Sequence, residues 1–313
     1  MSDYVTAYAP ASIGNVAVGF DMLGIALSGA GDRVQARKIN NNSIIVKEVI
    51  DPNGNLHPHL STKADENTAS IAAKSLWDSQ GEGGGIELRV LKGLPLQSGM
   101  GSSAASAVAA TVAVNSLLSK PLPLGKLLPF ALEGEKYASG GMHADNVAPS
   151  LFGGLVLCPD ILLPEVFCLP SPSDISVVLV NPDLQVNTAS ARRILPKTVS
   201  MELWLEQQGL MSGFIHACYS SDVNLLGRTL RDVIIEPHRK KAIPCFDDIV
   251  SAAIKTGALG CTLSGSGPSM FALCKDDDAK DVANAMQQEF SKIGISSNLW
   301  ISAMNAPGAF IEA

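Results

Sequence analysis

The stretch from Pro95 to Ala105 (Pro-Leu-Gln-Ser-Gly-Met-Gly-Ser-Ser-Ala-Ala) places glycines and serines directly before a long apolar segment. Glycine lets the backbone adopt positive φ and come close to a ligand. The first N–H groups of a helix have no partner inside it, so they attract anions. The hydroxyls of Ser102 and Ser103 add ligands for phosphate oxygens or for a metal ion on them. The pattern predicts a phosphate-binding loop, with tight packing and Ser102 as a plain N-cap as the alternative.

Two common phosphate motifs do not explain this loop. The Walker-A pattern G-x-x-x-x-G-K-[ST] occurs nowhere in the chain. Gly99 to Ala104 fits the dinucleotide fingerprint G-x-G-x-x-A, but proline and polar residues precede it where a buried strand should run. About twenty residues further on, where that fingerprint has an acidic residue, the chain has Leu122 to Leu124.

The composition indicates a globular protein of one large or two medium domains. Of the 313 residues, 46% are hydrophobic and 17% are charged, which is enough for a substantial core. A net charge of −7 argues against general nucleic-acid binding, which normally shows as a basic stripe. The six cysteines form no C-x-x-C pair and are expected to be mostly buried, in a reducing compartment. The N-terminus does not resemble a signal peptide, so we expect a cytoplasmic protein.

The hydrophobic pattern mixes strands and helices without regular alternation, which favours an α+β fold over a doubly wound sheet. Strands are predicted at residues 4–8, 32–38, 43–49, 86–91, 155–158, 175–180, 259–263 and 269–274, with a last strand around Trp300. Helices are predicted at residues 66–80, 102–119, 124–137, 188–194, 200–217, 221–230, 242–256 and 277–291. Residues 159–172 are rich in proline and are expected to connect two domains.

Three motifs in a fixed order give the loop a family context. They are residues 10–21 (Pro-Ala-Ser-Ile-Gly-Asn-Val-Ala-Val-Gly-Phe-Asp), residues 95–105 and residues 263–269 (Leu-Ser-Gly-Ser-Gly-Pro-Ser). With them, nearly the whole chain resembles the GHMP kinase superfamily, named for galacto-, homoserine, mevalonate and phosphomevalonate kinases. Within the superfamily, the chain is most similar to the homoserine kinase family. The residues that carry this similarity are Asn15 with Gly19-Phe20-Asp21, Glu133-Gly-Glu135, His143-Ala-Asp145-Asn146, Thr188 through Arg192, and Glu236-Pro-His-Arg239.

Two departures from the wider superfamily bear on the substrate. Sugar and mevalonate kinases tend to have Gly-Lys where this chain has Ala11-Ser12, which argues against a sugar or mevalonate substrate. Met100 replaces a more usual leucine, a swap of similar volume.

The resemblance implies a two-domain α+β GHMP kinase fold with the nucleotide in a cleft between the domains. The N-terminal, ribosomal-S5-domain-2-like domain is expected over residues 1–165, and the C-terminal, ferredoxin-like domain over residues 166–313. The implied activity is ATP-dependent phosphorylation of the side-chain hydroxyl of L-homoserine, on the route to threonine. It also implies Mg²⁺ as a cofactor and often a homodimer, with no nucleic acid and no membrane as partners.

The resemblance also assigns the nucleotide site. The residues expected to hold the nucleotide are Pro95, Leu96, Gln97, Ser98, Gly99, Met100, Gly101, Ser102, Ser103, Ala104, Ala105, Gly265 and Gly267. Ser103 and Glu135 are expected to bind Mg²⁺, as hydroxyl and carboxylate oxygens suit that ion; for Glu135 the alternative is a solvated helix face. Asn67 is a candidate for contact with adenine, with a helix cap as the alternative.

The same resemblance assigns the acceptor site. Asp21 is a candidate for the ammonium group, and Arg192 and Arg239 are candidates for the carboxylate, which guanidinium binds bidentately. Residues expected to complete the pocket around the hydroxyl are Asn15, His143, Asp145, Asn146 and Thr188.

The general base is open in the sequence. Our hypothesis is that Asn146 orients the hydroxyl and acts in catalysis with Ser103 and Glu135. Asp145 would bind substrate, and the proton would leave late, to the γ-phosphate; Asp145 as the base is the alternative. Two other functions remain: a GHMP kinase for another small hydroxylated acid or alcohol, and a non-catalytic GHMP-like binding protein. The latter tends to lose the loop serines or the metal-binding acid, which this chain keeps.

Overall fold

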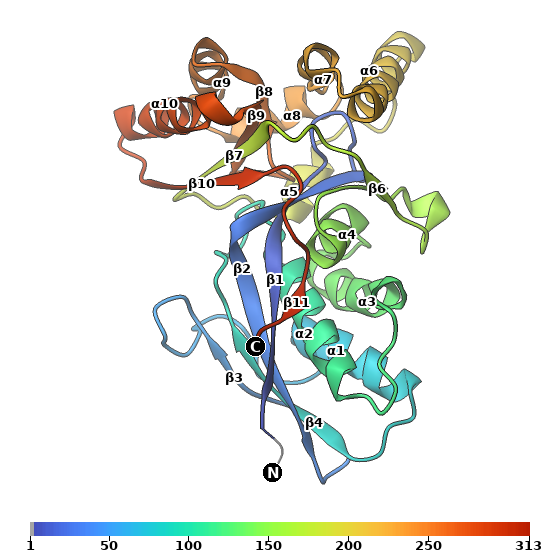
Figure 1. The fold of residues 1–313 in the computed structure, drawn as a ribbon. Helices are drawn as coiled ribbons and strands as arrows, with labels where there is room; N and C mark the ends of the chain where they lie inside the picture. The colour runs from blue at the N-terminus through green and yellow to red at the C-terminus, as the bar shows by residue number, and fades with distance from the viewer. Residues whose placement is uncertain (1–2) are drawn as a thin grey trace.

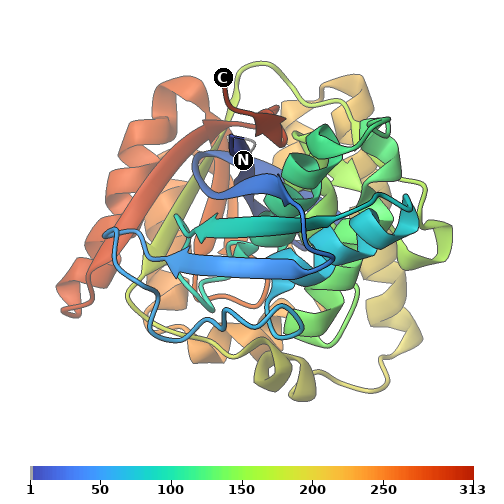
Figure 2. The same cartoon turned by 90° about the horizontal axis from the view of Figure 1, so that it is seen from below.

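The computed structural model describes residues 3–313, and their strands form two sheets (Figure 1). Among these residues the larger sheet has seven strands, which are β1 (Val5–Gly14), β2 (Leu23–Ile39), β3 (Ile44–Ile50), β4 (Gly85–Leu91), β5 (Leu155–Leu157), β6 (Phe167–Leu169) and β11 (Phe310–Ile311). Its order is β11-β1-β2-β4-β3, while β5 pairs with β2 and with β6. β3 pairs with β4 in parallel, and the two strands lie side by side beside α1 in the view from below (Figure 2).

Four helices accompany the larger sheet: α1 (Thr68–Ser79), α2 (Ser102–Leu117), α3 (Leu128–Ser139) and α4 (Ala144–Phe152). α2 and α4 pack against β1 and β2, and α1 and α3 pack against α2. The alanine- and valine-rich α2 is buried on nearly every side, as expected for a helix without a polar face. No helix of residues 3–313 has the length and apolar character needed to cross a membrane.

The second sheet has four strands within the described chain: β7 (Ile175–Pro182), β8 (Ala258–Leu263), β9 (Met270–Lys275) and β10 (Ser297–Ala303). Its order is β10-β7-β9-β8, and every pairing in it is antiparallel. α9 (Phe246–Lys255) lies between β7 and β8 in the chain and α10 (Ala279–Lys292) between β9 and β10. This order is the ferredoxin-like arrangement, and the predicted α+β class is confirmed.

The long connection from β7 to α9 carries the helices α5 (Thr188–Arg193), α6 (Met201–Ser220), α7 (Val223–Thr229) and α8 (Glu236–Arg239). Short 3-10 turns stand at η1 (Leu124–Lys126), η2 (Asp160–Leu162), η3 (Lys240–Ala242) and η4 (Asp276–Asp278). Three of the predicted acceptor residues lie on these helices. Thr188 and Arg192 are in α5, and Arg239 is in α8.

The structure adds to the expected elements in three places. Residues 143–146 form the N-cap and the first turn of α4, a short helix with an internal Pro149 that the sequence pattern does not predict. The proline-rich segment 159–172 is more than a connection, because it contains β6. The strand around Trp300 is not the last, since β11 returns to pair with β1. The domain boundary at 165/166 stays a prediction; the strands change sheets between β6 and β7.

Candidate functional site

A cavity of about 440 Å³ has walls from both halves of the chain. It collects most of the side chains that the sequence singled out. The predicted residues on its wall are Asn15, Asp21, Asn67, Leu96, Gln97, Ser98, Gly99, Gly101, Ser102, Ser103, Glu135, His143, Asp145, Asn146, Thr188, Arg192, Arg239 and Gly265.

Five predicted nucleotide residues do not line this cavity: Pro95, Met100, Ala104, Ala105 and Gly267. The side chains of Met100, Ala104 and Ala105 are fully buried in the hydrophobic core, because Met100 faces inward from the loop and α2 is buried on nearly every side. Gly267 is buried against Ile243 and Leu263. Met100, Ala104 and Ala105 therefore anchor the loop to the core, whereas Pro95 is exposed.

The backbone of the predicted phosphate loop requires its glycines. Gly99 has φ 75° and Gly101 has φ 65°, both in the left-handed region. A Cβ atom on Gly101 would lie 2.1 Å from the hydroxyl oxygen of Ser12, and one on Gly99 would lie 2.5 Å from the carbonyl oxygen of Ser264. Gly101 is the N-cap of α2, so the alternative of Ser102 as N-cap is wrong.

The three sequence motifs meet through hydrogen bonds. The Ser264 hydroxyl donates to the Gly99 carbonyl at 2.5 Å, and the Ser269 N–H donates to the Ser98 carbonyl at 3.2 Å. The Asn15 amide donates to the Gly265 carbonyl at 2.9 Å. The turn between β8 and β9 therefore links the loop before α2 to the turn after β1.

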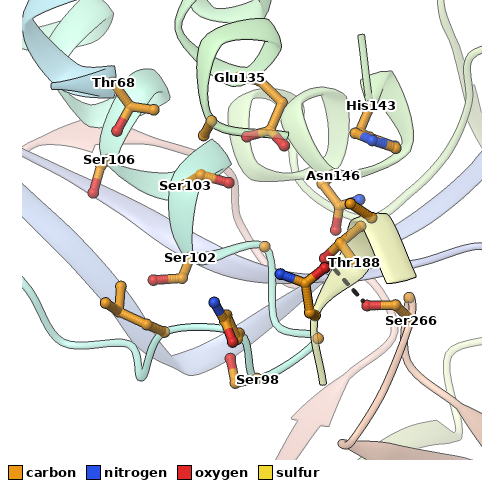
Figure 3. Close-up of a pocket in the computed structure, with 18 of the residues that line it drawn as sticks. Thr68, Ser98, Ser102, Ser103, Ser106, Glu135, His143, Asn146, Thr188 and Ser266 are labelled. Carbon is orange, nitrogen blue, oxygen red and sulfur yellow. Dashed lines mark hydrogen bonds between the residues drawn. The ribbon is translucent and has the colours of Figure 1, made fainter. Parts of the chain in front are cut away.

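Ser103 and Glu135 come from the start of α2 and from α3, and both line the cavity. Figure 3 shows the Glu135 carboxylate pointing from α3 toward Ser103. Glu135 is only 4% exposed, whereas its neighbour Lys136 is exposed. The alternative of a solvated helix face for Glu135 is therefore wrong. Hydroxyl and carboxylate oxygens are a donor set that fits Mg²⁺.

Asn67 is the N-cap of α1, as its alternative interpretation proposed. Its side-chain oxygen accepts from the N–H groups of Ala69 at 3.0 Å and Ser70 at 3.4 Å. Its amide nitrogen donates to the Ser61 carbonyl at 2.9 Å. Both ends of the amide are thus used within the protein, and the adenine contact stays a prediction.

Oppositely charged side chains gather at the other end of the cavity. One guanidinium nitrogen of Arg192 lies 2.8 and 2.9 Å from the two carboxylate oxygens of Asp21. Asp21, His143 and Asp145 place one ligand atom each within 4.8 Å of one another. Thr188 also lines the cavity, with its hydroxyl 3.4 Å from that of Ser266 (Figure 3).

Arg239 is almost wholly buried yet reaches the cavity wall. It is 4% exposed, and its Nη1 donates to the Gly265 carbonyl at 3.0 Å. Its Nε is buried and has no hydrogen-bond partner among the described residues. The guanidinium carbons of Arg239 and Arg192 lie 5.1 and 5.4 Å from the centre of the Phe20 ring. Because unpaired buried N–H groups are costly, this cation is suited to an incoming anion.

Asp145 is buried between two amide groups. One carboxylate oxygen accepts from the Asn15 N–H at 3.0 Å, and the other accepts from the Asn146 side chain at 3.2 Å. Burial, together with the negative charge of Asp21, raises the pKa of Asp145 to about 7. Burial also lowers the pKa of His143, which favours a neutral imidazole. The Asn146 side-chain oxygen accepts from the Ser12 hydroxyl at 3.1 Å.

A buried ion pair at the base of the phosphate loop escaped the sequence reasoning. Lys92 lines the cavity and pairs with Asp32 of β2, and both side chains are at most 2% exposed. The Lys92 Nζ also donates to the Ser102 carbonyl and to the Ser106 hydroxyl, at 2.9 Å each. The available signal was that Lys92 is the single charged residue between Arg89 and Lys120. Other wall residues that were missed are Leu60, Glu66, Thr68, Val90, Ser106, Tyr137, Ala138 and Asn187.

Family models and curated sequences match this chain to the same family of proteins. The family described as GHMP kinases N terminal domain matches residues 67–154, and the family described as GHMP kinases C terminal matches residues 214–292. The homoserine kinase of Chlorobium phaeobacteroides (strain BS1) is 41% identical, covering 97% of this chain and 98% of its own. That of Xylella fastidiosa (strain M12) is 38% identical, covering 97% and 92%.

Solved structures agree with the sequence comparisons. The homoserine kinase of Cytophaga hutchinsonii ATCC 33406 has a TM-score of 0.94 at 39% identity, covering 100% of this chain and 98% of that one. The mevalonate kinase of Methanococcus jannaschii has a TM-score of 0.70 at 16% identity, covering 96% and 99%, which is a likeness of fold alone.

Proposed function

Because this chain belongs to the homoserine kinases of the GHMP kinase family, we propose that it phosphorylates the side-chain hydroxyl of L-homoserine. ATP is the donor, and the products are O-phospho-L-homoserine and ADP, on the route to threonine. One observation carries the proposal: a phosphate-type loop and a set of paired opposite charges face the same cavity. The first suits ATP, and the second suits the zwitterionic head of an amino acid.

The nucleotide end of the site works mainly by position and charge. Phosphoryl transfer needs alignment and neutralisation of phosphate charge more than covalent help. The start of α2, with Gly99 and Gly101 before it, presents backbone N–H groups to the β- and γ-phosphates. Ser103 and Glu135 would hold Mg²⁺, which supplies positive charge to the phosphate oxygens when bound.

The acceptor end provides partners for both charges of homoserine. The Asp21 carboxylate is positioned for the ammonium group, and the buried Arg239 guanidinium for the carboxylate. Arg192 forms an ion pair with Asp21. The ammonium group of a bound zwitterion can replace Arg192 as the partner of Asp21, and its carboxylate can replace Asp21 as the partner of Arg192. Neither side chain is then left as an unpaired charge.

The hydroxyl of homoserine would be oriented by Asn146, whose amide Ser12 and Asp145 hold from two sides. An asparagine accepts no proton at neutral pH. Asp145 binds substrate in this scheme, and the hydroxyl proton leaves late, to the transferred phosphate. Asp145 as general base remains the competing assignment, since its pKa of about 7 suits either role.

Asp145→Asn separates the two assignments. If Asp145 binds substrate, we expect the KM for L-homoserine to rise about tenfold or more, because a charge-assisted hydrogen bond is lost. The measurement is steady-state kinetics with both substrates varied. A turnover that vanishes while homoserine affinity is unchanged would make Asp145 the base and our scheme wrong.

The same variant has a predicted effect on stability in the ligand-free protein. The folded-state pKa of Asp145, about 7, lies above the ordinary value of 3.8, so this group makes the free energy of unfolding fall as pH rises between them. Asparagine has no such titration. We therefore expect Asp145→Asn to raise the Tm relative to wild type more at pH 8 than at pH 5. An equal shift at the two pH values would contradict the raised pKa.

The proposed activity itself is tested by ADP release with L-homoserine, mevalonate, galactose and shikimate. We expect L-homoserine to give the highest kcat/KM, and equal or greater activity with another acceptor would refute the assignment. Homoserine binding without turnover of MgATP would instead favour a non-catalytic binding protein. The homodimer and the cytoplasmic location stay predictions, and sedimentation of the purified protein tests the first.

A further inference from the structure

Gln207 is a buried polar residue in the middle of α6. Gln207 is 7% exposed, while its neighbours Glu206 and Gln208 are exposed. It does not belong to the cavity wall. A buried amide is stable only when its donor and acceptor are both used, so the partners of Gln207 show what it does.

Those partners are backbone groups of two segments far apart in the sequence. The side-chain nitrogen donates to the Val18 carbonyl at 3.0 Å, and the side-chain oxygen accepts from the Val233 N–H at 3.0 Å. Val18 lies in the turn that leads to Asp21. Val233 lies in the segment that leads to Arg239. One side chain thus joins the segments that carry the anionic and the cationic partner proposed for the substrate.

The turn on the Val18 side needs support from outside. Asn15, Val16 and Ala17 have backbone φ values of 69°, 40° and 57°, which residues other than glycine rarely adopt. Such backbone persists only where its surroundings hold it. The Asn15 side chain holds it from the site, accepting from the Asp21 N–H at 3.0 Å. Gln207 holds the same turn from α6.

The segment on the Val233 side is built in the same way. The Asp232 carboxylate accepts from the N–H groups of Ile234, Ile235 and Glu236 at 2.8, 2.9 and 3.1 Å. These bonds lead the chain into α8, which ends at Arg239. The bond from Val233 to Gln207 fixes this capped segment to α6.

The ribbon shows the same connection at larger scale. The turn between β1 and β2, in blue, reaches up from the larger sheet to α6 and α7 (Figure 1). Gln207 is the hydrogen-bonded contact between this turn and α6. The place of Asp21 relative to Arg239 therefore depends on a helix that does not itself carry a substrate residue.

We propose that Gln207 is a positioning residue for the amino-acid acceptor, setting Asp21 and Arg239 at the separation that a zwitterion requires. The proposal rests on the proposed function, because it takes these two residues as the partners of the ammonium and carboxylate groups. Gln207 acts through the backbone at Val18 and Val233 and does not touch the substrate.

Gln207→Met tests this by removing both hydrogen bonds while keeping an unbranched side chain of similar length. With two bonds lost, we expect the KM for L-homoserine to rise about tenfold. The kcat and the KM for MgATP should stay within about twofold of wild type, because the phosphate loop is held by other contacts. A purely structural role would change both KM values together or neither, and either result would overturn the proposal.

Gln207→Leu is the second variant, and it serves if Gln207→Met does not fold. Leucine has neither the donor for the Val18 carbonyl nor the acceptor for the Val233 N–H, so the KM for L-homoserine should rise again. Gln208→Leu, the same substitution one residue away on the exposed side of α6, is the matched control and should leave both KM values unchanged. If the variants at positions 207 and 208 had the same KM for L-homoserine, the positioning role of Gln207 would be refuted.

The proposed function and the role of Gln207 fail separately. A wild-type protein that prefers another zwitterionic acceptor refutes the homoserine assignment. The KM comparison between Gln207→Met and wild type with that acceptor still decides whether Gln207 positions the head group.

Discussion

Lys92→Met is expected to lower the free energy of unfolding by about 3–5 kcal/mol and to raise the KM for MgATP. Removing one partner of a buried ion pair leaves the other charge without compensation, which is more costly than losing the pair as a whole. Here the remaining charge is the Asp32 carboxylate, which is fully buried.

The effect on MgATP follows from where the pair lies. One Asp32 oxygen accepts from the N–H groups of Gly93 at 2.9 Å and Leu94 at 3.2 Å, where the chain enters the phosphate loop. The Lys92 Nζ donates to the Ser102 carbonyl and the Ser106 hydroxyl, where the chain leaves the loop into α2. The pair therefore holds both arms of the loop together, and its loss should loosen the phosphate site.

Urea unfolding and steady-state kinetics check the two parts of this prediction. Lys120→Met removes an exposed lysine and is the control, with an expected change of less than about 0.5 kcal/mol. The double variant with Lys92→Met and Asp32→Asn should recover part of the stability but not the affinity for MgATP. No buried charge is left, and the amide oxygen of asparagine can still accept from Gly93 and Leu94. A loss below about 1 kcal/mol in Lys92→Met would mean that the pair is not buried as the structure has it.

Glu135→Gln is expected to lower kcat/KM for MgATP about a hundredfold or more. Glu135 is the proposed Mg²⁺ ligand, and the amide keeps the shape of its side chain but removes the negative charge. Metal ions contribute several kcal/mol to phosphoryl transfer. Calorimetry gives a readout independent of turnover: Mg²⁺ should strengthen ATP binding in wild type and do so much less in the variant.

Glu133→Gln is the matched control for this prediction. Glu133 stands two residues earlier on the exposed side of α3, so the same loss of charge occurs away from the cavity. We expect it to keep wild-type kinetics and the wild-type effect of Mg²⁺. If Mg²⁺ strengthens ATP binding equally in wild type and Glu135→Gln, then Glu135 is not a ligand of the ion.

The sequence predicted the fold class, most helices and strands, and the cluster of side chains at the cavity. It did so where the signal is local: glycines before an apolar helix, apolar periodicity, and motifs of fixed spacing. The sequence did not predict elements that depend on contacts between distant parts of the chain or that are too short to show a periodic pattern. α4 is short and begins with polar residues, and the two-residue β11 exists only because β1 offers it an edge.

The sequence by itself determined that a glycine- and serine-rich loop precedes an apolar helix, and it predicted an acceptor set that contains both carboxylates and arginines. Only the tertiary structure decided how these charges are paired. Asp32 pairs with Lys92, Asp21 pairs with Arg192, and Gln207 bonds to the two backbone segments that carry the predicted acceptor residues. The physical reason is that backbone preference acts between neighbours in the chain. The energy of a charge or a buried amide is set by distance in space and by the loss of water around it.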